Sequence, residues 1–304
     1  MIPLELLKPT GSRALGFCVY GGPGTKKTFA VHTLPPPICL LEFEGGEASI
    51  LPWTRRTRAW NGSWKEYTQK EREAMLVAGE SSIKPAPLVD VIGFDNTDPE
   101  SYETLVKVVG EFPVKMYNSV VIDPLYELAV ETQAITKHKA GHGLMEPFPG
   151  GLLWGPAQER AGILLRKLRN YRDLGVFVYM ISSEQIDKDY VKDPRSSKPG
   201  EHTQEPYSVK GTCNVPGKLV NVVQHMTDVQ IHSRQLNGEV TWVTKPEPLP
   251  GGTAVWEAKD RTGRIAEGYM KPSFRAMCLQ IYGEEAPRIY AAGREPEVGI
   301  SDES

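Results

Sequence analysis

The stretch that decides the fold of this chain reads Gly21-Gly22-Pro23-Gly24-Thr25-Lys26-Lys27-Thr28. It matches the Walker A pattern G-x-x-x-x-G-K-[ST] except at Lys26, which stands where the pattern has its second glycine. An apolar run over residues 15–20 precedes it and predicts a buried strand, and residues 27–32 predict a short helix. This strand–loop–helix order is the context that the pattern requires. The alternative is a glycine-rich turn that happens to precede Lys-Lys-Thr.

The loop predicts a site for a nucleoside triphosphate. Its consecutive backbone N–H groups point into a concavity, and the following helix N-terminus adds partial positive charge. Lys27 is expected to reach the β- and γ-phosphates, and Thr28 to offer its hydroxyl to Mg²⁺. A glycine at position 26 would let the backbone approach phosphate closely, whereas a lysine crowds it and adds a complementary charge. We therefore expect ATP binding with weak hydrolysis or none.

A second element supports this interpretation. Residues 120–123 read Val-Val-Ile-Asp, an apolar β-branched run that ends in a carboxylate, as in a Walker B strand. A buried aspartate without a partner is costly, so one that closes an apolar strand usually meets a cation or a helix N-terminus. Asp123 is therefore expected to hold Mg²⁺ beside the loop. The predicted cofactors are ATP and Mg²⁺.

Composition indicates an ordinary globular chain. Of its 304 residues, 40% are hydrophobic and 24% are charged, and the net charge of −3 gives no bulk signal for nucleic acid. Residues 1–283 are expected to form one domain, and residues 284–304, with six acids against two arginines, an acidic flexible tail. No apolar stretch has the length of a membrane span. The four cysteines lack paired spacing, and the histidines lack metal-ligand spacing with them, which favours a reducing, cytoplasmic setting.

Strands alternate with helices over the first two thirds of the chain. Residues 38–43, 88–94, 119–122 and 176–181 predict strands, and residues 98–110 and 155–174 predict helices. This alternation predicts an α/β fold with a mostly parallel sheet covered on both faces by helices. Residues 227–234 and 239–244 flank Asn237-Gly238 and predict an antiparallel C-terminal hairpin, with 255–259 as a further strand. Residues 53–80, 137–154 and 185–218 are expected to be long loops.

Taken together, these motifs resemble RecA-type ATPases, in particular phage single-strand annealing proteins built on a minimal RecA core, and more distantly RadA and KaiC. The resemblance covers about residues 14–275. It is carried by the loop at 21–28, the strand 40–46 (Leu-Leu-Glu-Phe-Glu-Gly-Gly), the strand 120–123, and the segment 258–263 (Ala-Lys-Asp-Arg-Thr-Gly). The order of these motifs along the chain is more specific than any one of them.

The resemblance implies roles for further residues. Glu44 matches the glutamate that activates water, with Glu42 or Glu47 as alternatives. Lys259 and Arg261, two apart on a predicted strand, resemble a Lys-x-Arg element that reaches the γ-phosphate of a neighbouring subunit; the alternative is a solvated pair at a strand end. The family also places a polar sensor after the fifth strand, where Ser183 and Gln185 both remain candidates.

The resemblance further implies a homo-oligomer, either a ring or a filament, with ATP between subunits. It implies that the segments 137–154 and 185–218 bind single-stranded DNA, as in annealing and recombination in a phage, which would place the protein in the host cytoplasm. The alternative is a nucleotide-binding oligomeric subunit with a structural or regulatory role and little or no turnover. Salt-sensitive binding to oligonucleotides would separate the two.

Overall fold

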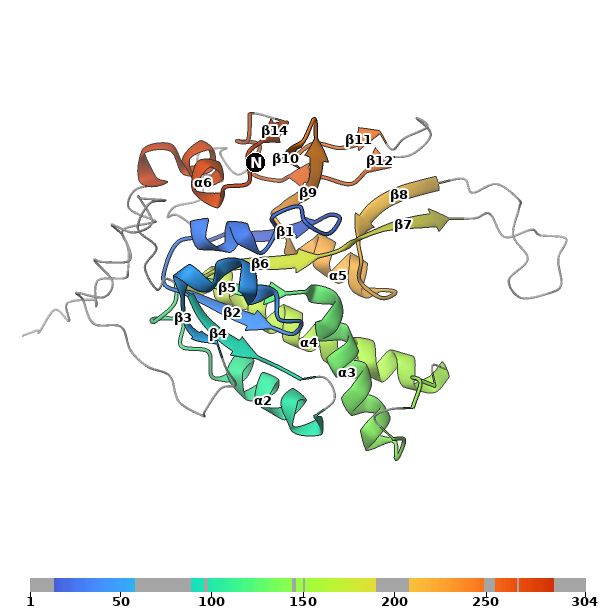
Figure 1. Ribbon diagram of the computed structural model, residues 1–304. Helices are drawn as coiled ribbons and strands as arrows, with labels where there is room; N and C mark the ends of the chain where they lie inside the picture. Colours follow the sequence, from blue (N-terminus) through green and yellow to red (C-terminus); the bar gives the residue numbers. More distant parts are fainter. Residues whose placement is uncertain are drawn as a thin grey trace, which may run out of the picture.

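The computed structural model describes residues 14–57, 89–95, 98–143, 146–149, 151–189, 208–248, 255–266 and 268–286. Its centre is a sheet with the strand order β14-β10-β9-β1-β6-β5-β2-β4-β3, with β13 paired to β9 (Figure 1). The strands from β9 to β3 are parallel to one another. The bounds are β1 Gly16–Tyr20, β2 Ile38–Glu42, β3 Thr54–Thr57, β4 Val89–Gly93, β5 Ser119–Asp123, β6 Phe177–Ser182, β9 Val229–Leu236, β10 Glu239–Val243, β13 Lys259–Asp260 and β14 Tyr269–Met270.

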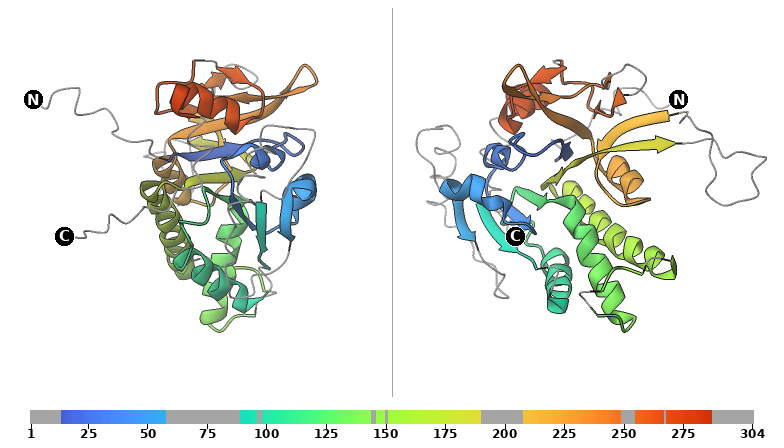
Figure 2. Two further views of the ribbon diagram at one scale, coloured as in Figure 1. Left: turned by 90° about the vertical axis from the view of Figure 1, so that its left-hand side faces the viewer. Right: turned by 45° about the vertical axis from the view of Figure 1, so that its right-hand side comes forward.

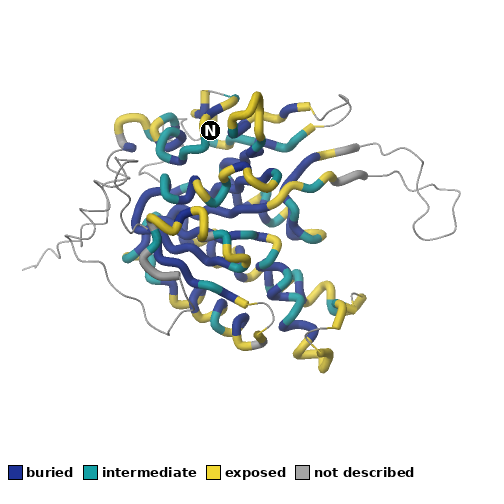
Figure 3. Tube along the Cα trace, in the orientation of Figure 1, coloured by how far each residue is buried: buried dark blue, intermediate teal, exposed yellow. Residues whose placement is uncertain are grey.

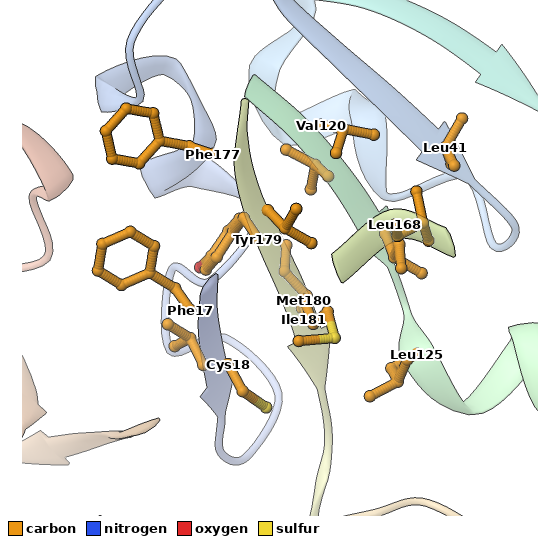
Figure 4. Close-up of a cluster of buried hydrophobic side chains, with 14 of the residues drawn as sticks. Phe17, Cys18, Leu41, Val120, Leu125, Leu168, Phe177, Tyr179, Met180 and Ile181 are labelled. Carbon is orange, nitrogen blue, oxygen red and sulfur yellow. The ribbon is translucent and has the colours of Figure 1, made fainter. Parts of the chain in front are cut away.

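Helices cover both faces of this sheet, as the sequence predicts. One face carries α2 (Pro99–Gly110), α3 (Leu125–Lys139), α4 (Trp154–Tyr171) and α5 (Leu219–Met226), and the other carries the 3₁₀ helices η2 (Phe29–Thr33) and η3 (Gly46–Trp53) with α6 (Phe274–Tyr282) (Figure 2). The central strands are buried throughout (Figure 3). Phe17, Phe177 and Tyr179 point to the α6 side of the sheet, and Leu168 and Leu125 lie on the other side (Figure 4). The α/β class is therefore confirmed.

The helix that follows the loop is shorter than a P-loop usually requires. Residues 27–32 predict a helix, and the structure has the five-residue 3₁₀ helix η2 at this place. Pro35, Pro36 and Pro37 follow directly, and proline lacks the N–H that another helical turn would need. The chain therefore turns at once into β2.

The C-terminal hairpin forms as predicted. β9 and β10 pair antiparallel, and the two residues between them, Asn237 and Gly238, have φ values of 51° and 83°. Positive φ at both positions is the requirement of a type I′ turn, which the Asn-Gly pair meets at low cost. The antiparallel C-terminal extension of the sheet is thus built by β10 and β14.

All three of the predicted long loops contain regular structure. Within 185–218, β7 (Glu184–Asp189) pairs antiparallel with β8 (Ser208–Cys213), and this hairpin extends away from the body of the molecule (Figure 1). β8 also pairs with β12 (Val255–Trp256), which pairs with β11 (Glu247–Pro248), so a second sheet forms. The predicted strand 255–259 is split between this sheet and β13. Within 53–80, Thr54–Thr57 is β3, and within 137–154 the helix α3 continues to Lys139.

The described part of the predicted single domain continues through α6 into the 3₁₀ helix η6 (Gly283–Glu285), beyond which Ala286 is buried. Most of the predicted acidic tail, from residue 287 on, lies outside the described residues. Among the helices that the structure describes, none combines the length and the apolar character needed to cross a bilayer.

A buried glutamate on α3 makes stability depend on pH. Burial, helped by the carboxylates of Asp95, Asp98 and Glu127 and opposed by a hydrogen bond from Ser101, raises the pKa of Glu131 to about 7. The folded state therefore holds this proton more tightly than the unfolded chain, and the stability that it contributes below about pH 4.5 is lost as pH rises to about 7.

Replacing Glu131 with glutamine, which mimics the protonated acid, should remove this dependence. We expect the stability of the variant relative to the wild type to rise by about 2 to 3 kcal/mol between pH 5 and pH 8, most of the worth of a shift of this size. Urea unfolding of both proteins at pH 5, 6, 7 and 8 measures the difference. A difference that does not change with pH would contradict the assignment.

Candidate functional site

The loop of residues 21–28 leaves the C-terminal end of β1 and is braced by the neighbouring strand β9. A Cβ at Gly21 would lie 1.9 Å from the carbonyl oxygen of Ser233, so only glycine fits this close approach. The hydroxyl of Ser233 donates to the carbonyl of Thr25 at 2.8 Å. On the strand to the other side, β6, the hydroxyl of Tyr179 donates to the carbonyl of Lys27 at 3.2 Å. The backbone of the loop is therefore held from two strands.

Lys27 is drawn into the loop that it is predicted to serve. Its Nζ donates to the carbonyl oxygens of Gly21 and Gly22 at 2.8 and 2.7 Å. Burial lowers the pKa of Lys27, and the nearby carboxylates of Asp123 and Glu184 act in the opposite direction. The ammonium thus donates to carbonyl oxygens of the loop, and phosphate oxygens could replace these carbonyls as its partners.

The two residues predicted to hold Mg²⁺ meet directly. Thr28 Oγ1 donates to Asp123 Oδ2 at 2.5 Å, although 95 positions separate them in the chain. A Cβ at Gly46 would lie 3.2 Å from Asp123 Oδ2 and 3.6 Å from Thr28 Oγ1, so the absence of a side chain there leaves room beside the pair. One hydroxyl and one carboxylate with space at their side fit Mg²⁺, which proteins usually hold by few ligands of their own.

Lys26 adopts the backbone conformation of the glycine that it replaces. Its φ is +56°, in the left-handed region, and its side chain is exposed. The side chain therefore does not crowd the loop as the sequence suggests; the cost of the lysine lies in the backbone, about 1–2 kcal/mol for a residue with a Cβ.

Lys26→Gly is expected to raise ATP turnover severalfold, because it removes this cost from any rearrangement of the loop. Lys26→Ala is the matched control, since it removes the charge and keeps the Cβ. Steady-state phosphate release measures both. Equal rates in the wild type and the glycine variant, or a lower rate in the latter, would show that residue 26 does not limit catalysis.

Glu44 lies in the turn after β2, two residues before Gly46, which borders the Thr28–Asp123 pair. Its side chain is exposed, whereas Glu42 is buried and accepts hydrogen bonds from the backbone N–H of Glu44 and of Gly46 at 2.9 and 2.6 Å. Glu42 thus shapes the turn, and of these two glutamates Glu44 has the exposed side chain that a water-orienting role needs.

Lys259 and Arg261 lie away from the loop of their own chain. β13 pairs with β9 at Gln230 and Val229, the end opposite to the one that contacts the loop. Lys259 Nζ donates to the carbonyl of Gln224, and Arg261 Nη1 donates to that of His225 at 3.3 Å, so both cations cap the C-terminal end of α5. The structure thus brings together residues 21–28 and Asp123 with the turn that carries Glu44, and leaves Lys259 and Arg261 apart.

Glu184 also lies beside the loop, and no pattern in the sequence indicates it. Of the three residues after β6, Ser183 and Gln185 are the predicted sensors, but Glu184 faces the loop: its Oε1 would lie 3.5 Å from a Cβ on Gly22. Ser183 instead accepts from the amide of Asn214 at 3.0 Å, and Gln185 pairs with Thr212 in the hairpin. Glu184 Oε2 lies 3.2 Å from Nε2 of the buried His232. No local pattern marks this pair, which only the sheet brings together.

Known proteins offer few matches to this chain. No protein-family model matches the chain, and no curated protein does. Among solved structures, the chain is similar to the flagellar accessory protein FlaH from Methanocaldococcus jannaschii, with 8% sequence identity, a TM-score of 0.32, and coverage of 75% of this chain and 76% of that chain. The loop and the residues that contact it are therefore the features of this chain that indicate its function.

Proposed function

We propose that this protein binds ATP together with Mg²⁺ in the loop of residues 21–28. The observation that carries the proposal is the 2.5 Å hydrogen bond from Thr28 Oγ1 to Asp123 Oδ2. It joins the last residue of a Walker A pattern to the carboxylate that ends a buried strand, which is the arrangement that both motifs predict. A glycine-rich turn without this role would have no reason to meet that carboxylate.

The chain's own residues would divide the work as follows. The loop N–H groups and Lys27 hold the phosphates, and Thr28 with Asp123 hold Mg²⁺. Bound Mg²⁺ would neutralise charge on the phosphates. Glu44 would orient the attacking water from its exposed position after β2.

The proposal is tested by the Mg²⁺ dependence of nucleotide binding. Calorimetric titration with ATP should give at least about tenfold tighter binding with Mg²⁺ than with a chelator, and Asp123→Asn should lose this increment because a neutral amide is a poorer Mg²⁺ ligand than a carboxylate. Asp173→Asn, an exposed change of the same kind on η5 (Arg172–Leu174), is the matched control. A wild-type protein that binds no ATP refutes the proposal.

We further propose that the protein assembles into a RecA-like ring or filament and anneals single-stranded DNA. The support is the resemblance of the motifs, together with the position of the β7–β8 hairpin, which begins at Glu184 beside the loop and reaches away from the body (Figure 2). A hairpin placed there could respond to nucleotide. Three of the six lysines and arginines of 185–218, namely Lys192, Arg195 and Lys198, lie outside the described residues.

Fluorescence titration of a labelled oligonucleotide at two salt concentrations, with and without ATP, tests this part. Tighter binding at low salt and a change with ATP are expected, since phosphate contacts release counterions. If ATP binds while DNA does not, the alternative of a nucleotide-binding structural or regulatory subunit is favoured instead.

A further inference from the structure

A buried histidine between two carboxylates borders the proposed phosphate site. His232, on β9, is 2% exposed, and its Nε2 and Nδ1 lie 3.2 Å from Glu184 Oε2 and 3.0 Å from Glu247 Oε1. Its ring stacks on those of Tyr20 and Trp256, at centroid distances of 5.1 and 4.3 Å, and these two rings also contact each other at 6.3 Å. These two polar contacts and two ring contacts fix the orientation and position of the imidazole.

Glu247, at the buried end of this series of contacting side chains, is held by a second partner. Glu247 is buried, and its second oxygen, Oε2, lies 2.7 Å from Nη2 of Arg234. Glu247 therefore has a cation of its own and does not depend on His232 for charge compensation. His232 in turn offers its other nitrogen to Glu184, so Glu184 is held by a rigid support.

Glu184, at the other end of this series of side chains, lies beside the loop of residues 21–28. Glu184 Oε1 lies against Gly22, whose carbonyl oxygen accepts a hydrogen bond from Lys27 at 2.7 Å. The negative charge of Glu184 also acts on the Lys27 ammonium, opposing the effect of burial on its pKa. A carboxylate with this influence on Lys27 must act with the opposite sign on an anion that Lys27 binds.

We infer that Glu184, positioned by His232, determines how well this site distinguishes a triphosphate from a diphosphate. The inference rests on the proposed function. The terminal phosphate of ATP brings the negative charge that ADP lacks, and Lys27 is the residue that reaches it. Repulsion from Glu184 therefore falls more heavily on ATP than on ADP, and it lowers the preference for ATP that the loop and Lys27 would otherwise give.

Glu184→Gln removes the charge and keeps the shape at a side chain that is 38% exposed, so the fold should be retained. Affinities for ADP and for the non-hydrolysable analogue AMP-PNP, both with Mg²⁺, are measured by calorimetry. We expect the ratio of the affinity for AMP-PNP to the affinity for ADP to rise about tenfold, mostly because AMP-PNP binds more tightly. This is about the effect of removing one negative charge whose repulsion of the terminal phosphate is partly screened by solvent. Glu159→Gln, an exposed change of equal charge on α4, should leave the ratio unchanged.

His232→Phe keeps an aromatic ring beside Tyr20 and Trp256 and loses the polar contacts of both ring nitrogens with Glu184 and Glu247. If His232 positions Glu184, this variant should move the ratio in the same direction, whereas a purely structural role would weaken both ligands equally. An unchanged or lowered ratio in Glu184→Gln overturns the inference and leaves the proposed function standing. A wild-type protein that binds neither ligand overturns both.

Discussion

Replacing Lys27 with alanine is expected to weaken ATP binding by at least about 100-fold. Lys27 is the residue whose ammonium lies within the loop, where it donates to the carbonyls of Gly21 and Gly22. Charge-assisted hydrogen bonds to phosphate contribute about 1.5–3 kcal/mol each to binding. Their loss lowers the binding free energy more in a site that is partly shielded from water. The alanine variant also lacks the hydrogen bonds from the ammonium to these two carbonyls, so an interaction that stabilises the loop itself is lost as well.

The measurement is a calorimetric or fluorescence titration with ATP and Mg²⁺. Lys107→Ala, an exposed lysine on α2, is the control for the change in net charge. Thermal unfolding of both variants shows whether the fold is intact. Affinity within about threefold of the wild type in a folded Lys27→Ala protein would show that residues 21–28 do not bind the triphosphate.

The parts of the fold that could be predicted are those where local chemistry and burial agree. β2, β5 and β6 lie between other strands and beneath helices on both faces, so their sequences are continuous apolar runs. The β9–β10 turn is dictated by two residues, Asn237 and Gly238, that accept positive φ. The contact between Thr28 and Asp123 follows in the same way, because the loop that carries Thr28 leaves the C-terminal end of β1 and Asp123 ends β5, and a parallel sheet brings these ends to one edge.

What could not be predicted depends on pairing between distant segments. β7 reads Glu-Gln-Ile-Asp-Lys-Asp, which has the composition of a loop and becomes a strand only because β8 pairs with it. α3 was missed because its buried side carries polar residues, Glu131, Thr132 and Thr136 among them, and so lacks a clear apolar stripe. The contact between Glu184 and His232 joins residues 48 positions apart, and neither has a neighbour in sequence that marks it.

Lys259 and Arg261 are predicted to act on the phosphate of a neighbouring subunit, and the structure places neither beside the loop of its own chain. β13 contacts β9 at Gln230, whereas the loop contacts β9 at Ser233, three residues or about 10 Å further along the strand. Burial, and then the charge of Arg261, lowers the pKa of Lys259 to about 8. Arg261 is exposed and keeps its charge at any physiological pH. Of the two, Arg261 is therefore the cation available to a second copy of the chain.

Arg261→Ala should accordingly leave ATP binding by isolated subunits unchanged and lower hydrolysis by at least about 100-fold, since an arginine supplied in trans is worth 10³–10⁵ in rate. Glu44→Ala should abolish hydrolysis for a different reason, the loss of the water-orienting carboxylate. In an equal mixture of the two variants, about a quarter of head-to-tail interfaces would combine an intact Glu44 with an intact Arg261. Phosphate release should recover to a comparable fraction of the wild-type rate.

The control for this mixture is Arg169→Ala, an exposed arginine on α4, which should hydrolyse ATP at the wild-type rate alone and in mixtures. Co-purification of differently tagged variants establishes that mixed assemblies form. Recovery in such assemblies requires that one subunit supplies Arg261 to a site whose Glu44 belongs to another, because neither variant has both. If the variants co-purify and the mixture stays inactive, Arg261 does not act across an interface, and its bond to the carbonyl of His225 at the end of α5 is then the whole of its role.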